Sequence, residues 1–141
     1  MDILIIEDQR DHADFISKLI RRHVPAAEVT IVGTLDAGFA MDNTSRRHDV
    51  AVVDLLLAEN FSAQHLKPDQ IQMVDGVRLS EWIFKQELCR KFLFITASDQ
   101  IDLLKKYEFG GLEMDRKFLK KTDEEYPDEL VKIVKEFMDM N

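Results

Sequence analysis

The sequence is poor in cysteine, in basic residues and in long apolar runs, and each shortage excludes a class of protein. A single cysteine, Cys89, excludes an internal disulfide and favours a cytoplasmic location over a secreted one. The 19 basic residues are outnumbered by 27 acidic ones, and the net charge of −8 argues against direct binding of nucleic acid. Because an acid stands at Asp2 and only four apolar residues separate it from Glu7, we expect no signal peptide and no membrane insertion.

The sequence also lacks a glycine-rich phosphate loop, an internal repeat and a low-complexity tract. Gly110-Gly111 precedes a predicted strand, which is the reverse of the order in nucleotide-binding loops. Cys89 has no neighbouring base, so we interpret it as an inert thiol. The four histidines have no metal-ligand spacing, and we interpret them as scattered surface residues: His12, His23, His48 and His65.

The composition is that of one globular domain. A hydrophobic content of 45% and a charged content of 33% are ordinary for a folded protein and unlike those of a disordered one. The 141 residues are enough to bury a sizeable core, and no linker interrupts them. We therefore expect a single domain over residues 1–141.

Short apolar runs alternate with longer amphipathic segments along the chain. The apolar runs predict strands over residues 3–6, 28–32, 50–53, 92–96 and 116–120. Helical spacing predicts helices over residues 8–23, from Thr34 or Asp36 through 45, and over 76–88, 100–107 and 128–140. The inward positions expected include Phe15 on the first helix and Ala40 on the second. An irregular stretch with little periodicity occupies residues 58–73.

This alternation predicts an α/β fold in which helices cover both faces of a five-stranded parallel sheet. Right-handed crossovers leave few topologies, and the leading one is the flavodoxin-like, doubly wound order 2-1-3-4-5. In that order the first and third strands are neighbours at a switch point, where open α/β sheets bind ligands.

Acidic residues end both of these strands. Glu7 and Asp8 follow the first strand, and Asp54 closes the third. At ~5 Å and an effective dielectric of ~20, each like-charge pair among them costs roughly 3 kcal/mol. Such a cluster is kept where a hard cation binds, and carboxylate oxygens suit Mg²⁺.

The other strand ends complete a family pattern. Thr96-Ala97 follows the fourth strand, Lys121 follows the fifth, and Phe118 stands three residues before that lysine. Asp75-Gly76 opens the third helix. With the acids, these motifs make the chain resemble the receiver domains of bacterial two-component response regulators, of the stand-alone, chemotaxis-regulator-like kind, from end to end.

The resemblance implies a phosphoacceptor signalling domain and not an ordinary enzyme, although it would assist its own phosphorylation and dephosphorylation. Asp54 would take a phosphoryl group from a phosphohistidine of a sensor histidine kinase or phosphotransfer protein. Thr96 and Lys121 would contact the phosphoryl oxygens. Mg²⁺ would be held by four residues: Asp8 and Asp54 directly, Glu7 mainly through water, and Leu56 by its backbone carbonyl.

The family's output mechanism is also expected by resemblance. Thr96 would move toward the phosphoryl group and Phe118 would turn inward, which would remodel a face for a downstream protein target. The chain would be a monomer or a phosphorylation-dependent dimer. The face would present four side chains: Lys105, Lys106, Tyr107 and Lys120. For the lysines, an ordinary solvated charged surface is an equally good interpretation.

Three departures from the family pattern stand out. Asp54 and Gly76 are 22 positions apart (76 − 54), about a dozen more than usual, and the extra residues lie in 58–73. We favour a tolerated surface insertion over a lid or partner-recognition element. Thr122 stands where the family usually has a proline joined by a cis bond. Because a cis bond before a non-proline residue is costly, the bond after Lys121 can be trans. The methionine or proline usual after the phosphoacceptor is absent from Leu56 and its neighbours.

Two other classes of function remain. The first is a phosphorylation-independent, receiver-like protein-binding module. The second is an enzyme of the same sheet architecture, either a flavin carrier or an aspartyl-phosphate phosphatase. Acids at Glu7-Asp8 would repel a flavin phosphate, and a phosphatase would normally carry an aspartate where Leu56 stands, so both enzymes fit poorly.

Overall fold

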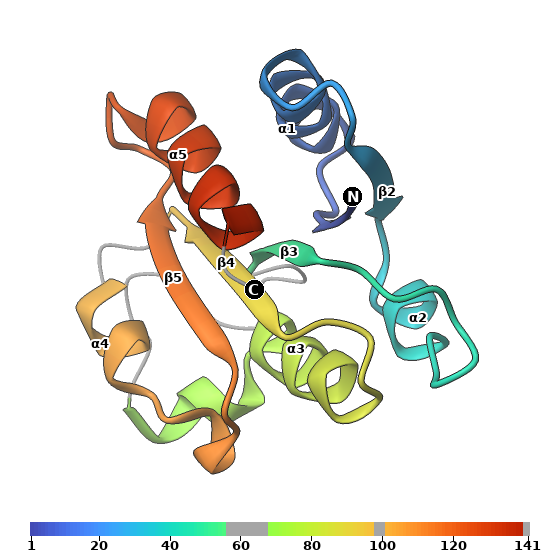
Figure 1. Ribbon diagram of the computed structural model, residues 1–141. Helices are drawn as coiled ribbons and strands as arrows, with labels where there is room; N and C mark the ends of the chain where they lie inside the picture. The colour runs from blue at the N-terminus through green and yellow to red at the C-terminus, as the bar shows by residue number, and fades with distance from the viewer. Residues whose placement is uncertain (56–67, 98–100, 140–141) are drawn as a thin grey trace.

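The computed structural model describes residues 1–55, 68–97 and 101–139 (Figure 1). The strands are β1 Asp2–Ile6, β2 Glu28–Val32, β3 Val50–Asp54, β4 Lys91–Thr96 and β5 Asp115–Lys120. The α-helices are α1 Arg10–His23, α2 Leu35–Phe39, α3 Asp75–Lys85, α4 Ile101–Lys106 and α5 Tyr126–Asp139. Two short 3₁₀ helices, η1 Pro68–Met73 and η2 Phe109–Gly111, precede α3 and β5.

The five strands form one parallel sheet in the order β2-β1-β3-β4-β5, which confirms the predicted flavodoxin-like topology. Ile6 of β1 pairs with Val53 of β3, and Asp54 pairs with Ile95 of β4. On the next strand pair, Thr96 is level with Lys120. The register therefore brings the carboxyl ends of the three central strands, and of β5, to one edge of the sheet.

Helices cover both faces of the sheet. Figure 1 shows α1 and α5 together on one face and α2 and α3 on the other, with α4 beside β5. Each strand supplies both cores: in β1, Ile3 and Ile5 face α1 and α5, whereas Leu4 and Ile6 face α3. This burial on both faces explains why β1 and β3 read as continuous apolar runs and not as alternating patterns.

The second helix is shorter than predicted. It begins where the Thr34 hydroxyl accepts from Ala37 N, and it ends at Phe39 instead of near residue 45. The reason is a competing local turn, in which the Asp42 carboxylate accepts from the backbone N–H of Thr44. Ala40, expected to point inward, lies beyond the helix and is exposed.

The first and third helices also differ in detail from the prediction. Phe15, expected among the apolar positions of α1, is 43% exposed. The helix α3 ends at Lys85 because Glu87 adopts a left-handed backbone (φ 60°), and Leu88 N then bonds to Ile83 O.

The predicted irregular stretch over residues 58–73 lies mostly outside the described residues. Its last part forms η1, and there Ile71 is buried in the core. Val74 N donates to Ile71 O, which leads the chain directly into α3. The end of the stretch is therefore anchored to the fold.

Among the described residues, none of the helices combines the length and apolarity that crossing a membrane requires.

Candidate functional site

Three carboxylates meet at the carboxyl edge of the sheet, as predicted. Glu7 and Asp8 follow β1, Asp54 ends β3, and one carboxylate oxygen from each lies within 4.8 Å of the others. Glu7 is 1% exposed and Asp54 is 7% exposed, whereas Asp8 is open to solvent. The cluster is therefore buried at Glu7 and Asp54 and open to solvent at Asp8.

Lys121 provides the opposing charge. Its Nζ lies 2.7 Å from Asp54 Oδ2 and 3.5 Å from Glu7 Oε1. The side chain is directed here because Lys121 N donates to Thr96 O, which continues the pairing of β4 and β5 by one residue. The peptide bonds of the described chain are all trans, including that between Lys121 and Thr122. The lysine thus reaches Asp54 through a trans bond to Thr122.

Thr96 is the last residue of β4 and is fully buried. It follows Ile95, the residue that pairs with Asp54, so it lies at the same edge of the sheet. Ala97, whose N–H was expected to assist, comes next and is exposed. Leu56, expected to contribute a backbone carbonyl, lies outside the described residues.

The environment of Glu7 is unusual for a carboxylate. Burial is the main reason that the pKa of Glu7 is raised; Asp54 raises it further, while His12 and Lys121 oppose the shift. Oε1 has both partners, His12 Nδ1 at 2.8 Å and Lys121 Nζ at 3.5 Å. Oε2 is buried and has no hydrogen-bond partner among the described residues. An orphaned carboxylate oxygen beside two further acids fits a hard, oxygen-seeking cation such as Mg²⁺.

His12 belongs to the site, so its interpretation as a surface histidine was wrong. Its Nδ1 contacts Glu7, and its Nε2 lies 2.9 Å from the Tyr126 hydroxyl at the start of α5. The short separation of Glu7 and His12 was the one available signal in the sequence. Tyr126 is 114 positions from His12, and nothing in the sequence connects the two.

Two further interpretations can be judged against the structure. His48 is also buried, contrary to expectation, and burial lowers its pKa, whereas His23 is exposed as expected. His65 lies outside the described residues. Cys89 is buried, and burial raises the pKa of its thiol to about 12, as expected of an inert thiol.

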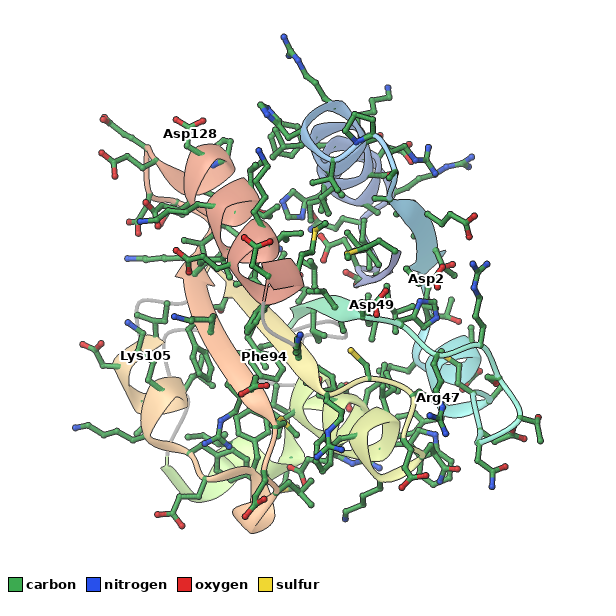
Figure 2. The ribbon with its side chains drawn as sticks, viewed as in Figure 1. Asp2, Arg47, Asp49, Phe94, Lys105 and Asp128 are labelled. Carbon is green, nitrogen blue, oxygen red and sulfur yellow. The ribbon has the colours of Figure 1, made fainter. Side chains whose placement is uncertain are left out.

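An aromatic cluster lies behind Thr96 on the α3 side of the sheet. The rings of Phe94 and Phe118 are 5.3 Å apart, and those of Phe94 and Phe109 are 5.0 Å apart. Figure 2 places Phe94 in the middle of the molecule, beside β4 and β5. Phe118 is half-buried and already packs inward.

The side chains expected on the output face are only partly exposed. Lys105 and Lys106 are exposed on α4, and Figure 2 shows Lys105 at the outer side of the molecule. Tyr107 and Lys120 are half-buried. The Tyr107 hydroxyl donates to Glu81 Oε1 at 3.0 Å, and burial, with this acid, raises its pKa to about 12. This part of the expected face is therefore tied to α3.

The sheet order and the helical layers are those of response-regulator receiver domains, and the chain has that fold. No protein-family model matches the chain, and no curated protein matches it. The likeness is carried by solved structures at low sequence identity.

Three of these structures illustrate it. The receiver domain of the Francisella response regulator 1452 is 17% identical, with a TM-score of 0.66 over 99% of this chain and 98% of that one. A receiver protein from Pseudoalteromonas atlantica is 14% identical, with a TM-score of 0.71 over 99% and 98%. A response regulator from Burkholderia pseudomallei, with a phosphorylated aspartic acid, a calcium ion and citrate, is 16% identical, with a TM-score of 0.64 over 99% and 67%.

Proposed function

We propose that residues 1–141 form a receiver domain that accepts a phosphoryl group on Asp54. One observation carries this proposal. The Asp54 carboxylate ends a central strand at the crevice of the sheet, 2.7 Å from Lys121 Nζ and grouped with two further carboxylates. A nucleophilic carboxylate, a fixed cation and a cluster of acids are what aspartyl phosphorylation requires.

The donor would be the phosphohistidine of a sensor kinase or phosphotransfer protein. An oxygen of Asp54 attacks phosphorus, the P–N bond breaks, and its electron pair leaves with the imidazole. The product is an acyl phosphate on Asp54. A relative of the same fold, the Burkholderia regulator, has been seen with a phosphorylated aspartic acid and a divalent cation, which supports this chemistry.

Asp8 and Asp54 would hold Mg²⁺ directly, Glu7 would contribute through water, and the backbone carbonyl of Leu56 would add an oxygen. When bound, Mg²⁺ supplies positive charge that offsets the charge on the carboxylates and the phosphoryl oxygens. The orphaned Glu7 Oε2 and the exposed Asp8 support this role.

Lys121 and Thr96 would act on the phosphoryl group itself. Lys121 Nζ, now paired with Asp54, would donate to one phosphoryl oxygen as a point charge. The Thr96 hydroxyl would donate to another, and its movement would be relayed through Phe118 in the aromatic cluster. The same groups would assist hydrolysis of the acyl phosphate, so the domain would also control its own dephosphorylation.

The partners follow from this chemistry. A histidine kinase or phosphotransfer protein would dock over the crevice, and a downstream protein would read the remodelled face near α4, β5 and α5. A cytoplasmic location, and either a monomer or a phosphorylation-dependent dimer, are part of the proposal.

The test is labelling by acetyl phosphate in Mg²⁺, followed by intact mass. We expect the wild type to gain one phosphoryl group and Asp54→Asn to gain none. Asp49→Asn is the matched control. Asp49 stands just before β3, at the end of the strand opposite Asp54, and Figure 2 shows it beside Asp2. Undiminished labelling of Asp54→Asn would contradict the assignment.

The alternative is a binding module that does not turn over phosphate. Thr122 and the long connection after Asp54 are the features that favour it. Titration with Mg²⁺ and beryllofluoride separates the two functions, since the module would bind neither and the phosphoacceptor would bind both.

A further inference from the structure

A chain of hydrogen bonds leads from the acidic crevice across two helices. Glu7 Oε1 is 2.8 Å from His12 Nδ1 on α1, and His12 Nε2 is 2.9 Å from the Tyr126 hydroxyl on α5. The His12 side chain is only 19% exposed, and its ring stacks with that of Phe15 and with that of Tyr126, with centroids 6.2 and 5.9 Å away. The imidazole is therefore fixed in position as well as hydrogen-bonded.

The partners define the direction of each bond. The Tyr126 phenol is protonated at neutral pH and can donate to Nε2. An imidazole that accepts at Nε2 carries its proton on Nδ1, and this N–H then points to Glu7 Oε1. An ionised carboxylate only accepts, so the pairing with Glu7 requires the proton on Nδ1, and a Tyr126 hydroxyl that donates to Nε2 is matched to that tautomer.

The two carboxylate oxygens of Glu7 have different surroundings. Oε1 is engaged by His12 and by Lys121, whereas Oε2 is buried without a partner among the described residues. A carboxylate held at one oxygen cannot rotate freely, so the second oxygen keeps its direction. Groups that orient the ligands of a cation in this way commonly change its affinity 10–100-fold when they are removed.

We propose that His12 is a positioning residue of the phosphorylation site, which holds Glu7 through Oε1 and leaves Oε2 to serve the cation, and that Tyr126 orients His12. The inference rests on the proposed function, in which Glu7 serves a Mg²⁺ ion next to Asp54. It assigns roles to His12 and Tyr126, in addition to the acids, Thr96 and Lys121 of the site.

A purely structural role for His12 is the competing account. It would be a packed aromatic residue between α1 and α5, and any side chain of similar volume would replace it. The two accounts differ in whether the N–H at the Nδ1 position matters. Asparagine carries an N–H donor at the corresponding position, whereas leucine fills the same space without a donor.

The experiment measures Mg²⁺ binding to the unphosphorylated protein by calorimetry, in the wild type and in His12→Leu, His12→Asn and Tyr126→Phe. We expect His12→Leu to weaken Mg²⁺ binding by about tenfold or more, His12→Asn to restore most of it, and Tyr126→Phe to give an intermediate loss. His23→Leu is the control, since His23 is exposed at the end of the same helix.

Labelling by acetyl phosphate provides the second readout. We expect His12→Leu to need more Mg²⁺ for half-maximal labelling and to approach the wild-type rate at saturating Mg²⁺. Loss of a packing residue alone would lower the unfolding midpoint without shifting the Mg²⁺ requirement. If His12→Leu fails to fold, Tyr126→Phe, which removes a single oxygen atom, tests the same bond chain.

Unchanged Mg²⁺ affinity in His12→Leu, or in Tyr126→Phe where His12→Leu does not fold, would overturn the inference, and so would an equal loss in His12→Asn and His12→Leu. If the wild type is labelled on Asp54 while His12→Leu binds Mg²⁺ normally, only this inference fails. If the variants weaken Mg²⁺ binding but the wild type is not labelled, the positioning role of His12 at the cation site stands and the phosphoacceptor function fails. A wild type that binds no Mg²⁺ rejects both.

Discussion

Gly76 shows how a single residue shapes the site. A Cβ atom at this position would lie 2.5 Å from Asp54 O and 2.6 Å from both the Cα and the carbonyl oxygen of Leu55. These are backbone atoms, which cannot rotate away as a side chain can. Gly76 N also donates to Leu55 O at 3.1 Å. The helix α3 therefore begins directly against the residues that carry the proposed phosphoacceptor, and glycine is needed for that close approach.

Gly76→Ala should destabilise the fold by about 1–3 kcal/mol, because the added methyl group must displace backbone. The measurement is urea unfolding, with the rate of labelling by acetyl phosphate as a second readout of the Asp54 position. Gly33→Ala is the control, since its Cβ would meet only Glu7 O at an ordinary 3.8 Å. Equal unfolding midpoints for the two variants would contradict this account.

At the scale of the element, α2 depends on few local interactions. It has five residues, and its first turn is capped by the Thr34 hydroxyl. Its C-terminal side is held by α3, where Trp82 Nε1 donates to Met41 O at 2.8 Å and the Trp82 and Phe39 rings are 6.3 Å apart. A helix this short has little stability of its own, so packing and capping maintain it.

Thr34→Ala should therefore lower the free energy of unfolding by about 1 kcal/mol, the usual cost of losing a side-chain cap. Thr34→Ser keeps an oxygen acceptor and should remain near the wild type. Chemical denaturation of both variants provides the comparison. A loss of similar size in Thr34→Ser would show that the threonine methyl group, and not the cap, stabilises α2.

At the scale of the whole molecule, the acidic cluster concentrates part of the negative charge of the protein at one place. The net charge is −8, and three carboxylates approach within 4.8 Å at one edge of the sheet. Lys121 is the cation whose ion pairs with Glu7 and Asp54 offset part of this repulsion. A divalent cation in the crevice would offset more of it and would favour the folded state, because the cluster exists only there.

Adding Mg²⁺ should raise the melting temperature, with stabilisation of about 2.7 kcal/mol once Mg²⁺ reaches a hundredfold excess over its dissociation constant. Chelation by EDTA should reverse the shift. Asp8→Asn should lose most of it, and NaCl at matched ionic strength should not reproduce it. A shift of equal size in Asp8→Asn would indicate screening of the net charge instead of a bound ion.

The strands could be predicted because their residues are buried on both faces, which leaves a continuous apolar run in the sequence. The handedness of the crossovers left few possible strand orders, and the leading one was confirmed. Helix ends were less predictable: the end of α2 depends on the Asp42 turn, and that of α3 on a left-handed Glu87. Both are local choices between nearly equal conformations, which hydrophobic periodicity does not report.

The sequence by itself determined the α/β class and the meeting of Glu7, Asp8 and Asp54, because the carboxyl ends of neighbouring parallel strands share one edge. Only the tertiary structure decided how each acid is treated there. It buries Glu7 and leaves Asp8 open, and it brings Tyr126 of α5 to His12 of α1 across 114 positions. The physical reason is that burial and side-chain contacts between helices arise from three-dimensional packing, which no spacing along the chain encodes.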